Sequence, residues 1–225
     1  MSYVCIVSRH NLLLTIFINA IVGLTLTPYL ILRKGLILSI ITFCFIAICV
    51  LLWKEYFRYS LPTSVPSNYK SVKAGHNTSL FKEYKDPILL HFFNPRCPCS
   101  KFNSLYLQSL HRKYKNRITF LTVVEQAHIK DYKDQFDFKL IIDDGSIADS
   151  FGVYSTPQAV ILKDGKLIYR GNYNKERFCT EKDTYFPEII LDSLLNNKQL
   201  PDMPSAAYKA YGCKLNSDLN YIITQ

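Results

Sequence analysis

Two long apolar runs open the chain, and polar and apolar residues alternate after them. Residues 12–32 and residues 36–53 carry no charged side chain, and only Arg33-Lys34-Gly35 separates the two runs. Each run is close to the roughly 20 residues that a helix needs to cross the core of a bilayer. The pattern therefore predicts a membrane anchor in residues 1–53, built as two transmembrane helices. A single signal-anchor helix that starts near Leu36 is the alternative.

The charged residues near the two runs bear on which side of the membrane the rest of the chain occupies. Arg33 and Lys34 lie between the runs, and positive residues favour the cytoplasmic side. This rule puts residues 54–225 outside the cytoplasm, in a periplasmic or equivalent compartment, although Lys54 and Arg58 act in the opposite direction. No small-x-small cleavage site follows the second run, which argues against a signal peptide that is removed.

Residues 54–79 have the composition of a linker. The stretch is polar, contains two prolines and has no periodic apolar pattern. From residue 80 to residue 197 the pattern is that of a globular domain. Residues 198–225 are then expected to form a C-terminal tail.

Short apolar and β-branched runs predict five strands in the globular part. They lie at residues 88–93, 118–124, 139–142, 158–162 and 166–170. Helices are predicted after each of the first three strands and near the end of the domain, from the helical spacing of apolar residues. Strands that alternate with helices imply parallel crossovers, and Asp164-Gly165 predicts a closing antiparallel hairpin. The fold class is therefore α/β, with a central mixed sheet flanked by helices.

The net charge of +9 does not identify a nucleic-acid-binding protein. The basic residues are scattered and alternate with acidic and aromatic residues, and the sequence has no basic helix face or nucleic-acid motif. We therefore expect solvated surface charge, with attraction to lipid head groups as the next interpretation, and no nucleic-acid partner.

Four of the seven cysteines lie in the part of the chain after the apolar runs: Cys97, Cys99, Cys179 and Cys213. The other three lie in or beside the apolar runs, where cysteine commonly serves as a small apolar residue. Four cysteines allow three disulfide connectivities, and the sequence alone does not choose among them.

Cys97 stands where the first predicted strand passes into a helix. Pro98 suits the first turn of a helix, because its fixed backbone angle fits and its missing N–H costs nothing there. A thiolate at this position faces unpaired N–H groups, which favour the reactive form, and Arg96 adds a neighbouring positive charge. The order Cys97-Pro98-Cys99 points to a redox or metal-binding role rather than to a structural one.

Ser155-Thr156-Pro157 precedes the fourth predicted strand and supplies a second signal. Together with Cys97 and the Asp-Gly hairpin, it makes the chain resemble the thioredoxin superfamily over about residues 80–197. The nearest branch in this resemblance is that of the membrane-tethered redoxins related to alkyl hydroperoxide reductase and the thiol-specific antioxidants. The segments that carry the resemblance are Phe92-Phe93-Asn94-Pro95-Arg96-Cys97, Gly152-Val153-Tyr154-Ser155-Thr156-Pro157, Lys163-Asp164-Gly165-Lys166 and Tyr169-Arg170-Gly171.

This resemblance implies a thioredoxin-like fold and thiol–disulfide exchange on protein or small-molecule thiols and disulfides. It implies that Cys97 is the nucleophile. Cys99, two positions on, is our candidate for its partner. It also implies a cis peptide bond between Thr156 and Pro157, which would face Cys97 and border the substrate groove. No cofactor is expected for this chemistry.

The chain departs from the family at the position that resolves the mixed disulfide. The family motif has two cysteines separated by two residues, whereas Ser100 stands in the second position here. A serine cannot take part in disulfide exchange. Three routes remain open: Cys99 resolves through a small ring, an external thiol resolves, or Cys179 or Cys213 folds back. A structural disulfide that pins the tail to the domain through Cys179 and Cys213 is an equally weighted alternative.

Three other functions are weighed against disulfide exchange. Peroxide reduction ranks lower because Asn94 occupies the place of the threonine in the peroxidase signature of the family. Cys97 and Cys99 together would suit Cu(I), because soft thiolates bind this ion, so a copper-binding or metallochaperone-like protein is the main alternative. A non-catalytic interaction module on the same fold is the third.

Overall fold

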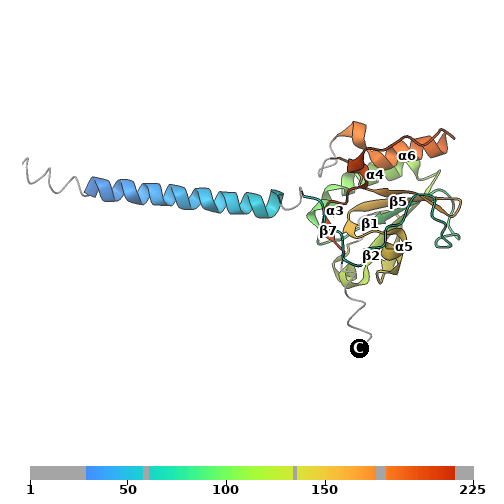
Figure 1. The fold of residues 1–225 in the computed structure, drawn as a ribbon, viewed down its shortest axis with the longest axis horizontal. Coiled ribbons are helices and arrows are strands. Elements are labelled where there is room, and N and C mark those ends of the chain that lie inside the picture. The colour runs from blue at the N-terminus through green and yellow to red at the C-terminus, as the bar shows by residue number, and fades with distance from the viewer. Residues whose placement is uncertain (1–28, 58–60, 134–135, 176–180, 216–225) are drawn as a thin grey trace, which may run out of the picture. The chain divides into compact units, whose positions relative to one another are not determined.

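The computed structural model describes most of the chain: residues 29–57, 61–133, 136–175 and 181–215. The chain divides into two units, Met1–Tyr56 and Phe57–Gln225, whose described parts are drawn as ribbons in Figure 1, and each unit is described by itself. The first predicted transmembrane run as far as residue 28, and also Cys179, lie outside the described residues.

The described part of the N-terminal unit is one long apolar helix, Tyr29–Leu52, followed by a π-helical turn, η1 (Trp53–Phe57). The helix runs through Arg33-Lys34-Gly35, so the predicted break between two helices at this point is wrong. Arginine and lysine are good helix formers, and one glycine costs about 1 kcal/mol relative to alanine, too little to end a long apolar helix. Its 24 residues extend about 36 Å at 1.5 Å each. By length and composition the helix could cross a membrane.

A five-stranded mixed sheet organises the second unit, in the order β3-β2-β1-β5-β6. The first three strands run parallel, and β5 and β6 are antiparallel to their neighbours. The strands are β1 (Ile88–Phe92), β2 (Thr119–Glu125), β3 (Lys139–Asp143), β5 (Gln158–Lys163) and β6 (Lys166–Gly171). The α/β class, the mixed sheet and the closing hairpin predicted from the sequence are confirmed.

Helices cover both faces of this sheet. Figure 1 shows α4 (Ser104–Tyr114) and α6 (Phe186–Leu195) on one side and α5 (Ser146–Phe151) on the other. One apolar cluster joins the sheet to α4 and α6, and a second joins its opposite face to α5. Every residue of β1 is buried, which accounts for its nearly unbroken apolar sequence.

Local sequence chemistry explains the turns that set the order of the elements. The β5–β6 hairpin closes through Asp164 and Gly165, whose φ angles are +52° and +67°. Asparagine, aspartate and glycine tolerate these positive angles, and the resulting turn matches the twist of paired strands. The polar stretch after β2, predicted to be helical, forms a short 3₁₀ helix, η2 (Gln126–Asp131).

The predicted linker and the predicted tail both pack onto the domain. The N–H of Gly75 donates to the carbonyl of Leu167 at 2.7 Å, and the N–H of Thr78 donates to the carbonyl of Gly165 at 2.8 Å. In the tail, α7 (Ser205–Tyr208) lies against the end of β6, where the N–H of Asn172 donates to the carbonyl of Ala207 at 2.8 Å. The described part of the predicted linker from Phe57 onward therefore belongs to the folded unit, as does the tail to residue 215.

One buried histidine carries no charge in the core. His91 in β1 is fully buried and contacts the hydroxyl of Tyr173 through Nδ1 at 2.7 Å. Burial lowers the pKa of His91 to about 3, because a charged ring would lose its hydration there. The imidazole is therefore neutral at neutral pH and belongs to the packing of the sheet.

Candidate functional site

Cys97 lies at the start of α3 (Pro98–Phe102), directly after the loop that leaves β1. Its backbone is extended (φ −85°, ψ 119°), and Pro98 begins the helix, as the sequence predicts. Asn103 continues in a helical conformation into α4, so the helix predicted as one element is two short consecutive ones. Only 1% of Cys97 is exposed, so its sulfur is reached only if a covering segment moves.

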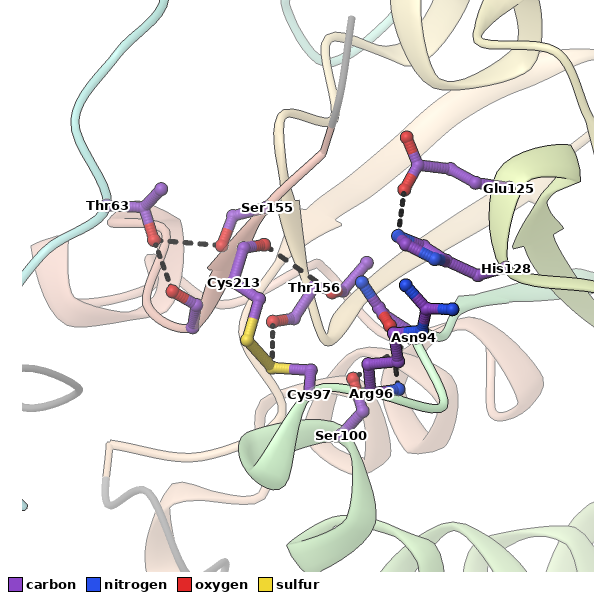
Figure 2. The surroundings of a disulfide bond; sticks show 11 residues. Thr63, Asn94, Arg96, Cys97, Ser100, Glu125, His128, Ser155, Thr156 and Cys213 are labelled. Carbon is purple, nitrogen blue, oxygen red and sulfur yellow. Dashed lines mark hydrogen bonds and ion pairs between the residues drawn. A yellow bond between two sulfur atoms is a disulfide. The ribbon is translucent and has the colours of Figure 1, made fainter. Parts of the chain in front are cut away.

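Cys97 forms a disulfide with Cys213, a residue of the C-terminal tail (Figure 2). The two Cα atoms are 5.8 Å apart, although the residues are separated by 116 positions in the sequence. The sequence leaves several partners open for Cys97, and the structure pairs it with the tail cysteine Cys213. Cys179 lies outside the described residues.

Cys99 lies outside this disulfide. It is the second residue of α3 and is buried, with 4% of its surface exposed. Residues two apart on a helix do not face each other, so the start of α3 does not favour a bond between Cys97 and Cys99. The structure therefore does not pair Cys97 with Cys99, the candidate partner predicted from the sequence.

A short antiparallel pair holds Cys213 beside Thr156-Pro157. β4 (Ser155–Thr156) pairs with β7 (Cys213–Lys214), with Thr156 opposite Cys213. The Thr156–Pro157 peptide bond is cis. The carbonyl oxygen of Thr156 is 3.5 Å from the sulfur of Cys97. The structure thus brings together three of the predicted site residues, Cys97, Thr156 and Cys213, and the tail occupies the strand edge expected to receive a substrate.

Gly212 allows the tail to approach this edge closely. Its φ angle is +129°, which residues with a side chain rarely adopt. A Cβ atom at this position would lie 2.0 Å from the carbonyl oxygen of Thr156. The glycine before Cys213 is therefore required by the geometry of the β4–β7 pair.

Ser100, which stands in the usual resolving position, holds the loop before Cys97. Its side chain is fully buried, and its hydroxyl accepts a hydrogen bond from the N–H of Asn94 at 3.3 Å. The side chain of Asn94 accepts a hydrogen bond from the N–H of Arg96 at 2.8 Å, and its carbonyl accepts one from the N–H of Cys97 at 3.0 Å. Ser100 thus fixes the approach to Cys97 and has no redox role.

Two pairs of ionisable side chains lie near the loop. Arg96 and Asp131 form an exposed ion pair at 2.7 Å. The ring of His128 lies 3.6 Å from the carboxylate of Glu125 (Figure 2). Burial lowers the pKa of His128, as does the charge of Arg96, and Asp131 offsets part of this effect. At neutral pH, His128 is therefore an uncharged ring beside a carboxylate rather than one half of an ion pair.

The described residues contain no group of three or more His, Cys, Asp or Glu side chains placed to hold a metal ion. Cys97 is committed to the disulfide, and a disulfide sulfur cannot act as a thiolate ligand. The Cu(I) site at Cys97 and Cys99 stays a prediction that would require the reduced protein.

A family model described as a domain of unknown function, DUF6436, matches residues 68–215. The chain belongs to this family. The matched region includes both cysteines of the disulfide and residues 68–79 of the segment predicted to be a linker. No curated protein matches the chain.

The chain is similar to several solved structures, of which the first named here shares the fold. A hypothetical protein from Sinorhizobium meliloti has a TM-score of 0.55 at 19% identity, covering 65% of this chain and 95% of its own. A secreted Mycobacterium tuberculosis disulfide oxidoreductase homologous to E. coli DsbE has a TM-score of 0.33 at 23% identity, covering 36% of this chain and 65% of its own. The thioredoxin domain of a thiol-disulfide oxidoreductase from Bacteroides vulgatus has a TM-score of 0.42 at 14% identity, covering 49% of this chain and 96% of its own.

The sheet order and its helical layers give the DUF6436 chain a thioredoxin-like fold, as predicted. Its structural neighbours include thiol–disulfide oxidoreductases. The closer affinity to the alkyl hydroperoxide reductase branch stays a prediction. Sequence reasoning missed Thr63, whose side chain contacts that of Ser155 at 2.9 Å. Thr63 lies in the polar stretch, where no pattern distinguishes it from a linker residue.

Proposed function

We propose that this chain performs thiol–disulfide exchange with Cys97 and Cys213 as its redox pair. The observation that carries the proposal is the disulfide between the cysteine at the helix entry and the cysteine of the tail strand. The bond lies beside Thr156-Pro157, at the edge of β4 that the tail strand β7 occupies. The tail thereby supplies the thiol that the serine at position 100 cannot.

The exchange proceeds through a mixed disulfide. The thiolate of Cys97 attacks one sulfur of a substrate disulfide, forms a new bond to it and releases the other sulfur as a thiolate. The thiolate of Cys213 then attacks the sulfur of Cys97 and releases the second substrate thiolate. Two electrons pass from the protein dithiol to the substrate, and the Cys97–Cys213 disulfide remains. The reverse sequence oxidises a substrate dithiol.

The long apolar helix is proposed to anchor the domain to a membrane. Support comes from its length of 24 residues and its mean hydropathy of 2.9. A stable disulfide suits an oxidising compartment such as the periplasm rather than a reducing cytosol. We therefore propose that the domain works outside the cytoplasm on protein or small-molecule thiols.

The proposal is tested by assaying disulfide reduction with the full-length chain in detergent, using a synthetic disulfide-linked peptide as substrate and dithiothreitol as reductant. We expect Cys97→Ser to lose activity down to the uncatalysed rate, because the attacking thiolate is gone. Cys99→Ser is the matched control, and it is expected to retain activity because Cys99 lies outside the pair. Equal losses in both variants, or activity in Cys97→Ser, would contradict the proposal.

A further inference from the structure

Three segments that are distant in the sequence meet beside the disulfide. They are the strap Pro62–Thr63, the strand β4 and the tail residues 210–213. The N–H of Thr63 donates to the carbonyl of Ala210 at 2.8 Å, and Pro62 pairs with Tyr211 as an antiparallel bridge. β4 pairs with the tail at Cys213. The tail therefore lies between the strap and β4.

The hydroxyl of Thr63 connects all three segments (Figure 2). It donates to the carbonyl oxygen of Gly212 at 3.2 Å and lies 2.9 Å from the hydroxyl of Ser155. Because a hydroxyl has one hydrogen, Ser155 is the donor to Thr63 when Thr63 donates to Gly212. Ser155 is fully buried, so its hydroxyl is shielded from solvent in this structure.

The β4–β7 pair alone is a weak support for Cys213. It comprises two residue pairs, and isolated two-stranded pairs are marginal in water even when longer. The position of Cys213 therefore depends on contacts from the other side of the tail, and the hydroxyl of Thr63 supplies one directly to the residue before Cys213.

We propose that Thr63 is a positioning residue that holds Cys213 at Cys97 and so sets the redox equilibrium of the pair. This inference rests on the proposed exchange function and adds a residue to its machinery. In the reduced protein the same contact keeps the thiol of Cys213 close to Cys97 for the resolving step. The strap thus acts on the reaction through the tail and touches neither sulfur.

The test compares full-length Thr63→Val and Thr63→Ser with the wild type in detergent. Valine keeps the shape and the backbone N–H but removes the hydroxyl, and serine retains the hydroxyl. Each protein is equilibrated in mixtures of reduced and oxidised glutathione, and the Cys97–Cys213 disulfide is quantified by alkylation and mass spectrometry. We expect valine to lower the equilibrium constant for disulfide formation about tenfold, equivalent to about 30 mV for a two-electron couple, and serine to restore it.

A second readout separates positioning from general stability. In the reduced protein, Thr63→Val should increase the alkylation rate of Cys213 while leaving that of the buried Cys99 unchanged. Equal equilibrium constants in the wild type and the valine variant, or equal losses in valine and serine, overturn the inference. If Thr63→Val fails to fold, Ser155→Ala removes the other hydroxyl and should shift the equilibrium in the same direction. A wild-type protein that forms no Cys97–Cys213 bond would instead overturn the proposed function.

Discussion

Replacing Cys213 with serine is expected to convert the exchange reaction into a single covalent capture. Cys97 still attacks the substrate disulfide, but the thiol that releases the second substrate sulfur is absent. The mixed disulfide between Cys97 and the substrate then accumulates, and steady-state turnover stops. Intact-protein mass spectrometry after incubation with the disulfide-linked peptide would detect an adduct of one peptide chain per protein.

Proximity explains why this effect should be large. Well-oriented groups within one molecule reach effective concentrations of about 10⁵ M or more, so an added small thiol cannot substitute for a tail cysteine held 5.8 Å away between Cα atoms. The controls are Cys99→Ser, which should turn over without accumulating adduct, and Cys97→Ser, which should form none. Turnover at the wild-type rate in Cys213→Ser would show that another thiol resolves Cys97.

Replacing Gly212 with alanine should displace the tail strand and deplete the disulfide. The added Cβ would lie 2.0 Å from the carbonyl oxygen of Thr156 and 3.3 Å from Cδ of Pro157. Backbone and ring atoms cannot move aside as the end of a flexible side chain can. The unfavourable φ of +129° adds about 1–3 kcal/mol of strain. In alkylation experiments on the folded protein, Cys213 should become reactive and the disulfide fraction should fall sharply.

Gly75→Ala is the matched control for this variant. Gly75 also has a positive φ, +85°, but a Cβ atom there would meet nothing within 4 Å. It should therefore show a modest loss of stability and an intact Cys97–Cys213 bond. An unchanged disulfide fraction in Gly212→Ala, or an equal loss in Gly75→Ala, would show that the close approach of the tail is not what places Cys213.

The parts of the fold that sequence predicts well are those with local causes. The apolar run of β1 and the Asp164-Gly165 hairpin each depend on a few neighbouring residues, and both are found where expected. Pro98 likewise marks the helix start that positions Cys97. The sequence predicts two helices because charged residues separate the two apolar runs. Arg33 and Lys34 instead fit within one helix.

The partner of Cys97 could not be chosen from the sequence for a physical reason. Cys213 is 116 positions away, and nothing in the tail pattern specifies which strand edge it meets. The strap around Thr63 leaves no sequence signal because it is held mainly through backbone groups and one hydroxyl. Such contacts leave no apolar periodicity, so a docked strap and a free linker have the same composition.

The disulfide connectivity of the full-length chain tests the central claim most directly. The protein is purified in detergent without reductant, its thiols are blocked by alkylation, and its tryptic peptides are sequenced by mass spectrometry. We predict a cross-linked pair of the peptides 97–101 and 210–214, with the bond at Cys97 and Cys213 and the alkyl group on Cys99. A bond from Cys97 to Cys99, or from Cys213 to Cys179, would contradict it.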